Sequence, residues 1–244
     1  MNRPSGEQFE IRHGAHRVVV VEVGGGIREW AGVLDGYAED AMCKSARGQV
    51  LAPWPNRLDE GRYQWDGVEH QVPLDEPPQA MHGLVRWRNW SAVARGEDRV
   101  ELEHVLHPTP GFPFSLRLRV EYRLDSNGLT VHTKAENVGE RALPFGVGHH
   151  PYIARHADEV FAPGETHDDA RPFTGEIAIA DVTVWGDEHW RWLQLYTGDE
   201  RPDVARRCVG VEPMTCRRDA LRTGEDVIRL EPGDVWDGRW GIAP

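Results

Sequence analysis

Apolar and polar residues alternate most regularly between positions 116 and 124. The apolar positions are Leu116, Leu118, Val120, Tyr122 and Leu124, and the positions between them are charged. A period of two is that of a β-strand with one buried face. The stretch runs into a turn sequence, DSNG at 125–128, and alternation resumes over 129–137. We therefore predict an antiparallel hairpin.

Shorter apolar stretches bounded by Gly, Pro, Asp or Asn predict further strands at 17–23, 99–105, 182–185, 193–197, 208–212 and 226–230. No long helical periodicity is present, so nothing favours a parallel sheet with crossover helices. The GGG at 24–26 indicates a flexible turn, and THDDARP at 166–172 indicates a loop. We predict an all-β fold, a large antiparallel β-sandwich, in one domain over 1–244.

The composition narrows the class of protein. The chain has 244 residues, of which 39% are hydrophobic and 28% charged, typical of a globular protein. Its formal net charge of -12 argues against a nucleic-acid partner, which requires a basic surface. No apolar run is long enough for a membrane span or a signal peptide, so we expect a cytoplasmic protein that does not interact with membranes. Three cysteines without C-x-x-C spacing predict reduced thiols rather than disulfides or a zinc site.

Four short blocks carry candidate chemistry. They are PWPNRL with Asn56 and Arg57, MHGL with His82, GHHPY with His150, and VGVEP with Glu212. Each histidine lies beside a glycine or proline, where a side chain can point into a cleft, although a structural role for a lone histidine is the commoner case. Adjacent histidines on extended backbone point to opposite faces, so His149 and His150 cannot both enter one cleft.

Glu212 and a histidine together offer a base and an acid near neutral pH. An ordinary glutamate is ionised there and a histidine titrates nearby. Such a pair can remove a proton from one oxygen while it delivers a proton to another, which is isomerisation chemistry.

The sequence resembles the aldose 1-epimerase (galactose mutarotase) family, particularly its bacterial branch. Matching blocks follow one another along most of the chain: PSGEQFEI, VVVVEVGGGIREW, GQVLAPWPNRLDEGRYQWDG, MHGLVRWRNW, GHHPYI, WLQLYTGD, VEPMTC, DALRTGED, LEPGD and WGI. The resemblance implies a galactose mutarotase-like supersandwich and an isomerase that interconverts the α and β anomers of a free aldose. It implies no cofactor and no metal, a small-molecule aldose as the partner, and a monomer or homodimer.

By the same resemblance, Glu212 is the general base for the anomeric hydroxyl and His150 is the general acid for the ring oxygen. His82 and Arg57 are expected to bind the sugar, with Asn56 beside them and Trp87 as a wall of the cleft. His149 is expected to be structural. The segment that supplies a sugar-binding aspartate in the family is short here, and Asp168 or Asp169 is its expected substitute.

Three alternatives stay open at this point. A hexose 6-phosphate 1-epimerase would use the same acid and base, with Arg57, Arg86 and Arg88 as candidate phosphate ligands. A non-catalytic carbohydrate-binding sandwich would need the cleft but not the pair. A metal site could use His82, His149 or His150 with Glu212, although the opposed directions of the adjacent histidines disfavour it.

Overall fold

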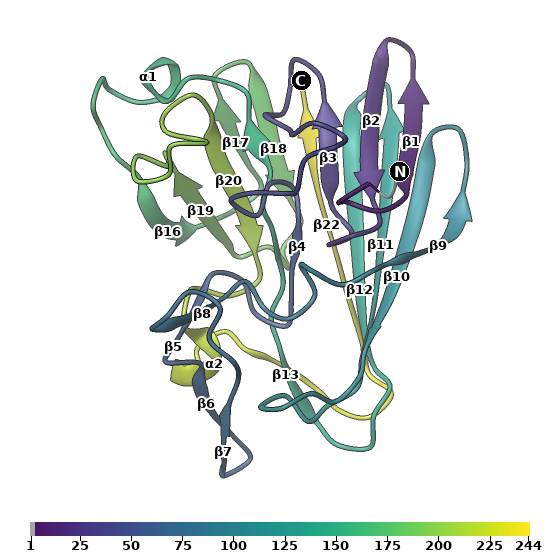
Figure 1. The fold of residues 1–244 in the computed structure, drawn as a ribbon, viewed down its shortest axis with the longest axis vertical. Helices are drawn as coiled ribbons and strands as arrows, with labels where there is room; N and C mark the ends of the chain where they lie inside the picture. The colour runs from purple at the N-terminus through teal and green to yellow at the C-terminus, as the bar shows by residue number, and fades with distance from the viewer. Residues whose placement is uncertain (1–2) are drawn as a thin grey trace.

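Two large antiparallel sheets dominate the computed structural model, which describes residues 3–244 (Figure 1). The larger sheet has the order β17 (Glu176–Ile179), β18 (Val182–Gly186), β22 (Val235–Ala243), β12 (Gly128–Asn137), β11 (Leu116–Asp125), β10 (Arg99–Leu106) and β9 (Ser91–Arg95). The second has the order β16 (Asp168–Pro172), β19 (Trp192–Tyr196), β20 (Val209–Met214), β14 (Gly148–His149) and β4 (Val50–Leu51), with β15 (Tyr152–Ile153) also paired to β20.

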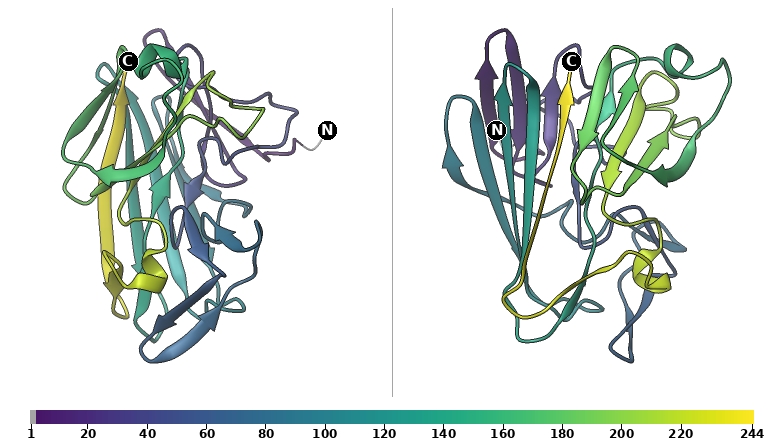
Figure 2. Two further views of the ribbon diagram at one scale, coloured as in Figure 1. Left: turned by 90° about the vertical axis from the view of Figure 1, so that its left-hand side faces the viewer. Right: turned by 180° about the vertical axis from the view of Figure 1, so that it is seen from behind.

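Smaller elements complete the fold. The remaining strands pair as β1 (Gln8–His13) with β2 (His16–Val21) and β3 (Ile27–Trp30), β5 (Arg57–Asp59) with β8 (Gln79–Met81), β6 (Arg62–Trp65) with β7 (Val68–Gln71), and β13 (Leu143–Phe145) with β21 (Ile228–Leu230). Two short helices are present, α1 (Ala157–Val160) and α2 (Ala220–Thr223). The β6–β7 hairpin and α2 lie at the end of the molecule opposite the C-terminus (Figures 1 and 2). The all-β, antiparallel prediction is confirmed.

The predicted hairpin is β11–β12, and its pairing shows why the alternation is so regular. All five apolar residues of the β11 pattern are fully buried, while the positions between them reach the surface. Burying a side chain of this size stabilises a fold by about 1.5–3 kcal/mol. These residues belong to one hydrophobic cluster that extends from Phe9 to Ile242 and takes in both large sheets. The two large sheets therefore share one hydrophobic core.

Two local predictions are wrong. Residues 168–172 form a strand, β16, rather than a loop. β16 is an edge strand paired with β19, its side chains are mostly exposed, and it therefore lacks the apolar alternation that marks a buried strand. The Gly24–Gly26 segment is crowded rather than flexible: a Cβ on Gly26 would lie 2.1 Å from the Gly48 carbonyl oxygen.

In the described part of the chain, no helix is both long and apolar enough for a membrane span.

Candidate active site

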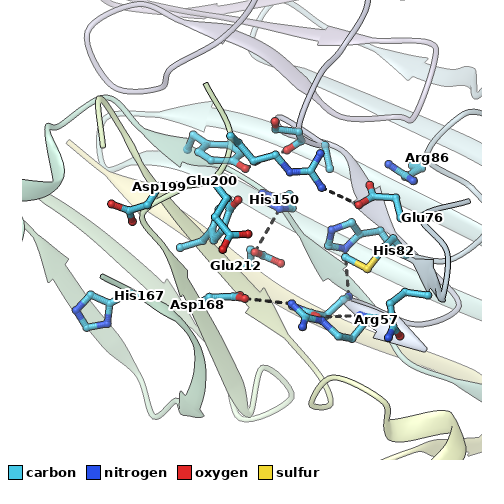
Figure 3. A pocket seen from close by; sticks show the side chains of 18 of the residues that line it. Arg57, Glu76, His82, Arg86, His150, His167, Asp168, Asp199, Glu200 and Glu212 are labelled. Carbon is cyan, nitrogen blue, oxygen red and sulfur yellow. Dashed lines mark hydrogen bonds and ion pairs between the residues drawn. The ribbon is translucent and has the colours of Figure 1, made fainter. Parts of the chain in front are cut away.

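A pocket of about 440 Å³ opens between the second sheet and the β5–β8 pair (Figure 3). This volume lies within the usual range for small-molecule sites. Six of the seven site residues predicted from the sequence line it: Asn56, Arg57, His82, His150, Asp168 and Glu212. They come from segments as far apart in sequence as β5 and β20, so their convergence is a product of the fold.

Glu212 and His150 form a buried pair in this pocket. His150 Nε2 lies 3.3 Å from Glu212 Oε1, and both side chains are at least 95% buried. Glu212 projects from β20 into the pocket. The sequence predicts that this strand ends at Glu212, but it continues to Met214. The His150 ring stacks on Tyr152, with centroids 4.8 Å apart, and its backbone carbonyl accepts a hydrogen bond from the Gly48 N–H. The imidazole is thereby held facing the carboxyl group.

Burial changes the protonation of both partners. It lowers the pKa of His150 to about 3 and raises the pKa of Glu212 well above its ordinary value. The nearby Asp168 carboxylate raises the pKa of Glu212 further, and Arg57 opposes that effect. Burial thus disfavours the charged form of each group, and it favours the arrangement in which Glu212 carries the proton and His150 is neutral. Transfer of that proton to His150 gives the ion pair without any exchange with solvent.

This arrangement predicts a flat pH profile toward acid for any reaction that uses the pair. Acid would stop the reaction by protonating both groups, but only near the depressed pKa of His150. Base would stop it by removing the proton from Glu212, but only at the raised pKa of Glu212. Because burial lowers the pKa of His150 to about 3, we expect no loss of kcat/KM as the pH falls from about 6.5 to about 5. Initial rates, corrected for the uncatalysed reaction, test this. A midpoint near the ordinary histidine pKa would contradict it.

The His82 ring lies beside the His150 ring in the pocket, and the two ring centroids are 5.2 Å apart. It is buried, and burial lowers its pKa well below the ordinary value, with the neighbouring His150 and Arg86 acting in the same direction. His82 is therefore a neutral imidazole at physiological pH.

Arg57 and Asp168 form the floor of the pocket beside Glu212. Arg57 Nη2 lies 3.1 Å from Asp168 Oδ2, and the Gln194 amide donates a 2.7 Å hydrogen bond to Asp168 Oδ1. Gln194 is directly opposite Glu212 in the β19–β20 pairing, so one strand pair positions both carboxyl groups. Asp169 faces elsewhere and lies 3.0 Å from His167 Nδ1. Of the two predicted substitutes, Asp168 is the one in the pocket.

His149 points away from the pocket, as the alternation of extended backbone requires. Its Nε2 lies 2.9 Å from Thr133 Oγ1 of the larger sheet, and its ring packs against Trp190 and Trp240. It is 1% exposed. His149 thus lies in the packing between the sheets.

The expectation for Trp87 is wrong. Its side chain does not line the pocket; it is 45% exposed and the Arg86 guanidinium lies over its ring. The buried indole of this block is Trp90.

Several pocket residues were not predicted as contacts. Arg201 Nη2 donates to Glu76 Oε2 at 2.7 Å, and both residues line the pocket. Arg86 also lines the pocket and pairs with Asp75. Tyr152 stacks on His150. Arg86 and Arg201 lie in loops and Tyr152 lies in the two-residue strand β15, where a single sequence gives no periodic signal that separates pocket residues from surface residues.

Known proteins resemble this chain in sequence and in fold. Residues 7–165 match the sequence profile of the family described as Aldose 1-epimerase. The chain belongs to this family. An uncharacterized Escherichia coli (strain K12) protein, YihR, is 29% identical over 94% of this chain and 90% of its own length. Human galactose mutarotase is 26% identical over 62% of this chain, a match that spans 47% of the human protein.

Solved structures of the family share the fold. The GalM/aldose epimerase homologue of C. elegans superimposes with a TM-score of 0.80 at 13% identity and covers 97% of this chain and 98% of its own. A galactose 1-epimerase from Lactobacillus acidophilus gives 0.73 at 15% identity, with 96% and 93% covered. The family resemblance and the supersandwich fold are both confirmed.

Metal-ligating side chains do not converge in the pocket. Within residues 3–244, the group close enough together to hold an ion is Asp187, Glu188 and His189, and none of the three lines the pocket. His149 cannot join His150 because it points into the packing between the sheets.

Proposed function

We propose that this protein is an aldose 1-epimerase that interconverts the α and β anomers of a free hexose by general acid–base catalysis. The observation that carries the proposal is the buried Glu212–His150 pair, 3.3 Å apart in a pocket of suitable size for one sugar ring. Membership of the family supports an isomerase, and the site supplies the groups that such a reaction needs.

The separation of the pair suits the chemistry of a sugar hemiacetal. The anomeric hydroxyl and the ring oxygen are bonded to the same carbon, so the base for one and the acid for the other must lie close together. Glu212 removes the hydroxyl proton, the bond from carbon 1 to the ring oxygen breaks, and His150 protonates the leaving oxygen. Rotation about the bond between carbons 1 and 2 turns the aldehyde, and closure with reversed proton transfers gives the other anomer.

Both protonation arrangements of the pair occur in this cycle. Ring opening converts the glutamate–imidazolium pair into glutamic acid and neutral imidazole, and ring closure reverses it. The neutral arrangement is the one that burial favours in the empty pocket. Because the pair keeps one proton and zero net charge throughout, no charge is created in the buried site.

The remaining pocket residues are suited to hold sugar hydroxyls. Glu212 Oε2 and Arg57 Nε are buried and have no hydrogen-bond partner in the described part of the protein. Asp168 and Arg57 lie on the Glu212 side and would bind hydroxyls near carbons 1 and 2. His82 lies on the His150 side and would donate to an oxygen there. Removing an unpaired buried polar group from water costs about 1–3 kcal/mol, which a bound hydroxyl would offset.

A hexose 6-phosphate epimerase is the second candidate, because three arginines surround the pocket. Each of the three is already paired with a carboxylate: Arg57 with Asp168, Arg86 with Asp75, and Arg201 with Glu76. A phosphate dianion would have to compete with these partners. The pairing, together with the net charge of -12, favours neutral sugars.

Polarimetry on freshly dissolved sugars tests the function. The protein should accelerate mutarotation of α-D-glucose or α-D-galactose to the rotation reached without enzyme, and should act less efficiently on glucose 6-phosphate. A higher kcat/KM on the phosphate ester would favour the second candidate. Absence of acceleration on all three sugars, with binding of one of them intact, would favour the non-catalytic binding protein.

Chelation tests the cofactor-independent chemistry. Because the acid and base are both protein side chains, dialysis against excess EDTA should leave the rate within about 2-fold of the untreated rate. A sample with zinc added back is the control. A large loss that zinc restores would show that the reaction depends on a metal.

A further inference from the structure

We infer that Arg47 is a positioning residue for His150, because it holds the Tyr152 ring on which the His150 imidazole stacks. Arg47 is not among the residues that line the pocket, so any effect of its side chain on catalysis is transmitted through other residues. The inference rests on the proposed function for its catalytic consequence, but the packing itself is a property of the protein without sugar.

The His150 imidazole has few polar contacts that could fix its orientation. Nε2 lies 3.3 Å from Glu212 Oε1, and Nδ1 is buried and makes no hydrogen bond to another residue in the described part of the chain. A histidine that transfers protons is commonly oriented by a hydrogen bond at its second ring nitrogen. Here the face of the ring supplies the second contact, since it stacks on Tyr152 with an angle of 18° between the two planes. The position of the Tyr152 ring therefore sets the orientation of the His150 ring.

Tyr152 is held by the turn at 44–49. Its hydroxyl donates a 3.1 Å hydrogen bond to the Ser45 carbonyl, and the central carbon of the Arg47 guanidinium lies 5.4 Å from its ring centroid. The same turn binds the backbone of His150, whose N–H donates at 3.2 Å to a carbonyl within the turn. The backbone of His150 and the ring behind its side chain thus depend on one short segment.

Arg47 fixes the conformation of this turn. Its side chain is 4% exposed and forms ion pairs with Asp35 at 3.0 Å and Asp203 at 2.6 Å. The guanidinium also donates to the Asp203 carbonyl at 2.5 Å and to the Lys44 carbonyl at 3.1 Å, so all three of its nitrogens are engaged. The two residues after Lys44 have left-handed backbone, with φ of 52° and 53°. Such a conformation persists where the surrounding contacts hold it, and the planar guanidinium supplies these contacts.

Arg47→Lys tests the positioning role, and Arg28→Lys is its control. Arg28 is also buried, does not line the pocket, and bonds to an amide oxygen, a backbone carbonyl and a carboxylate. Lysine keeps the charge at either position but cannot bind several partners in one plane or lie flat over a ring. We expect kcat of Arg47→Lys to fall at least about 10-fold with KM within about 3-fold of wild type, and kcat of Arg28→Lys to stay within about 2-fold.

The double variant with His150→Asn shows whether Arg47 acts through His150. If it does, adding Arg47→Lys to His150→Asn should lower kcat by no more than about 2-fold further. A further loss as large as that caused in the wild-type protein would overturn the inference, because Arg47 would then act independently of His150. An unchanged kcat in Arg47→Lys, or a rise in KM in place of the fall in kcat, would overturn it too. If Arg47→Lys does not fold, Asp203→Ala removes the more exposed partner of the ion pair, and the same pattern is expected.

Proton NMR of the sugar-free protein tests the packing independently of activity, and His150→Asn identifies the signals. The His150 ring protons should lie upfield of those of an exposed histidine because they face the Tyr152 ring. Arg47→Lys should move these signals downfield, whereas Arg28→Lys should not. Unmoved signals in Arg47→Lys would overturn the inference. An inactive wild type whose His150 signals respond as expected would refute the proposed function and leave the positioning of the ring by Arg47 standing.

Discussion

His150→Asn should lower kcat for mutarotation by at least about 10²-fold, whereas His149→Asn should leave kcat within about 2-fold of wild type. His150 faces Glu212 in the pocket, so its loss removes the proton donor for the ring oxygen. His149 packs between the sheets against Trp190 and Trp240. The two variants are matched controls for each other, because each replaces a histidine by asparagine at one of two consecutive positions.

The free energy of unfolding should be affected in the reverse order, with the larger loss in His149→Asn. His149→Asn breaks the contact with Thr133 and leaves space beside two tryptophans, so we expect a loss of about 1–3 kcal/mol in the free energy of unfolding. Thermal unfolding of both variants provides the control. If His149→Asn were the inactive variant while folded, and His150→Asn stayed active, the assignment of the acid would be wrong.

Glu212→Gln should also lower kcat by at least about 10²-fold, since an amide cannot accept the anomeric proton at neutral pH. The replacement keeps the shape of the side chain and removes a group whose pKa is raised by burial. The fold should therefore tolerate it, and thermal unfolding should show little change. KM should change less than kcat, because the amide still offers hydrogen bonds to the sugar.

The double variant gives a sharper result. Residues that act as one unit are not additive, so Glu212→Gln with His150→Asn should lose less than the product of the two single losses. A double loss equal to that product would show that the two groups act independently. A Glu212→Gln enzyme with near wild-type kcat would exclude Glu212 as the base.

The sequence predicted the strands in which buried and exposed residues alternate regularly. The β11–β12 hairpin was evident because each second residue is buried against one core. The opposed directions of His149 and His150 followed from the same geometry. β16 was missed because it is an exposed edge strand whose position is set by pairing with β19, which leaves no apolar pattern.

Some of the pocket residues could be predicted from the sequence, and others could not. His150 and Glu212, which the family resemblance predicts to be acid and base, lie in distinctive short blocks of the sequence, and the fold brings them within 3.3 Å of each other. Asp168 could not be separated from Asp169 before the register of β16 was known. Trp87 was misjudged because exposure of an indole depends on how its loop packs. The Arg201–Glu76 pair joins loops more than a hundred residues apart, and only the folded chain brings them together.

NMR exchange between the two anomers at equilibrium tests the central claim most directly. With α- and β-D-galactose already at equilibrium, saturation of one anomeric signal should reduce the other when wild-type protein is present, and the effect should vanish with Glu212→Gln and with His150→Asn. This measurement needs no net reaction and detects interconversion alone. Saturation transfer that persists undiminished in both variants, or that is absent with folded wild-type protein on glucose as well as galactose, would contradict the account.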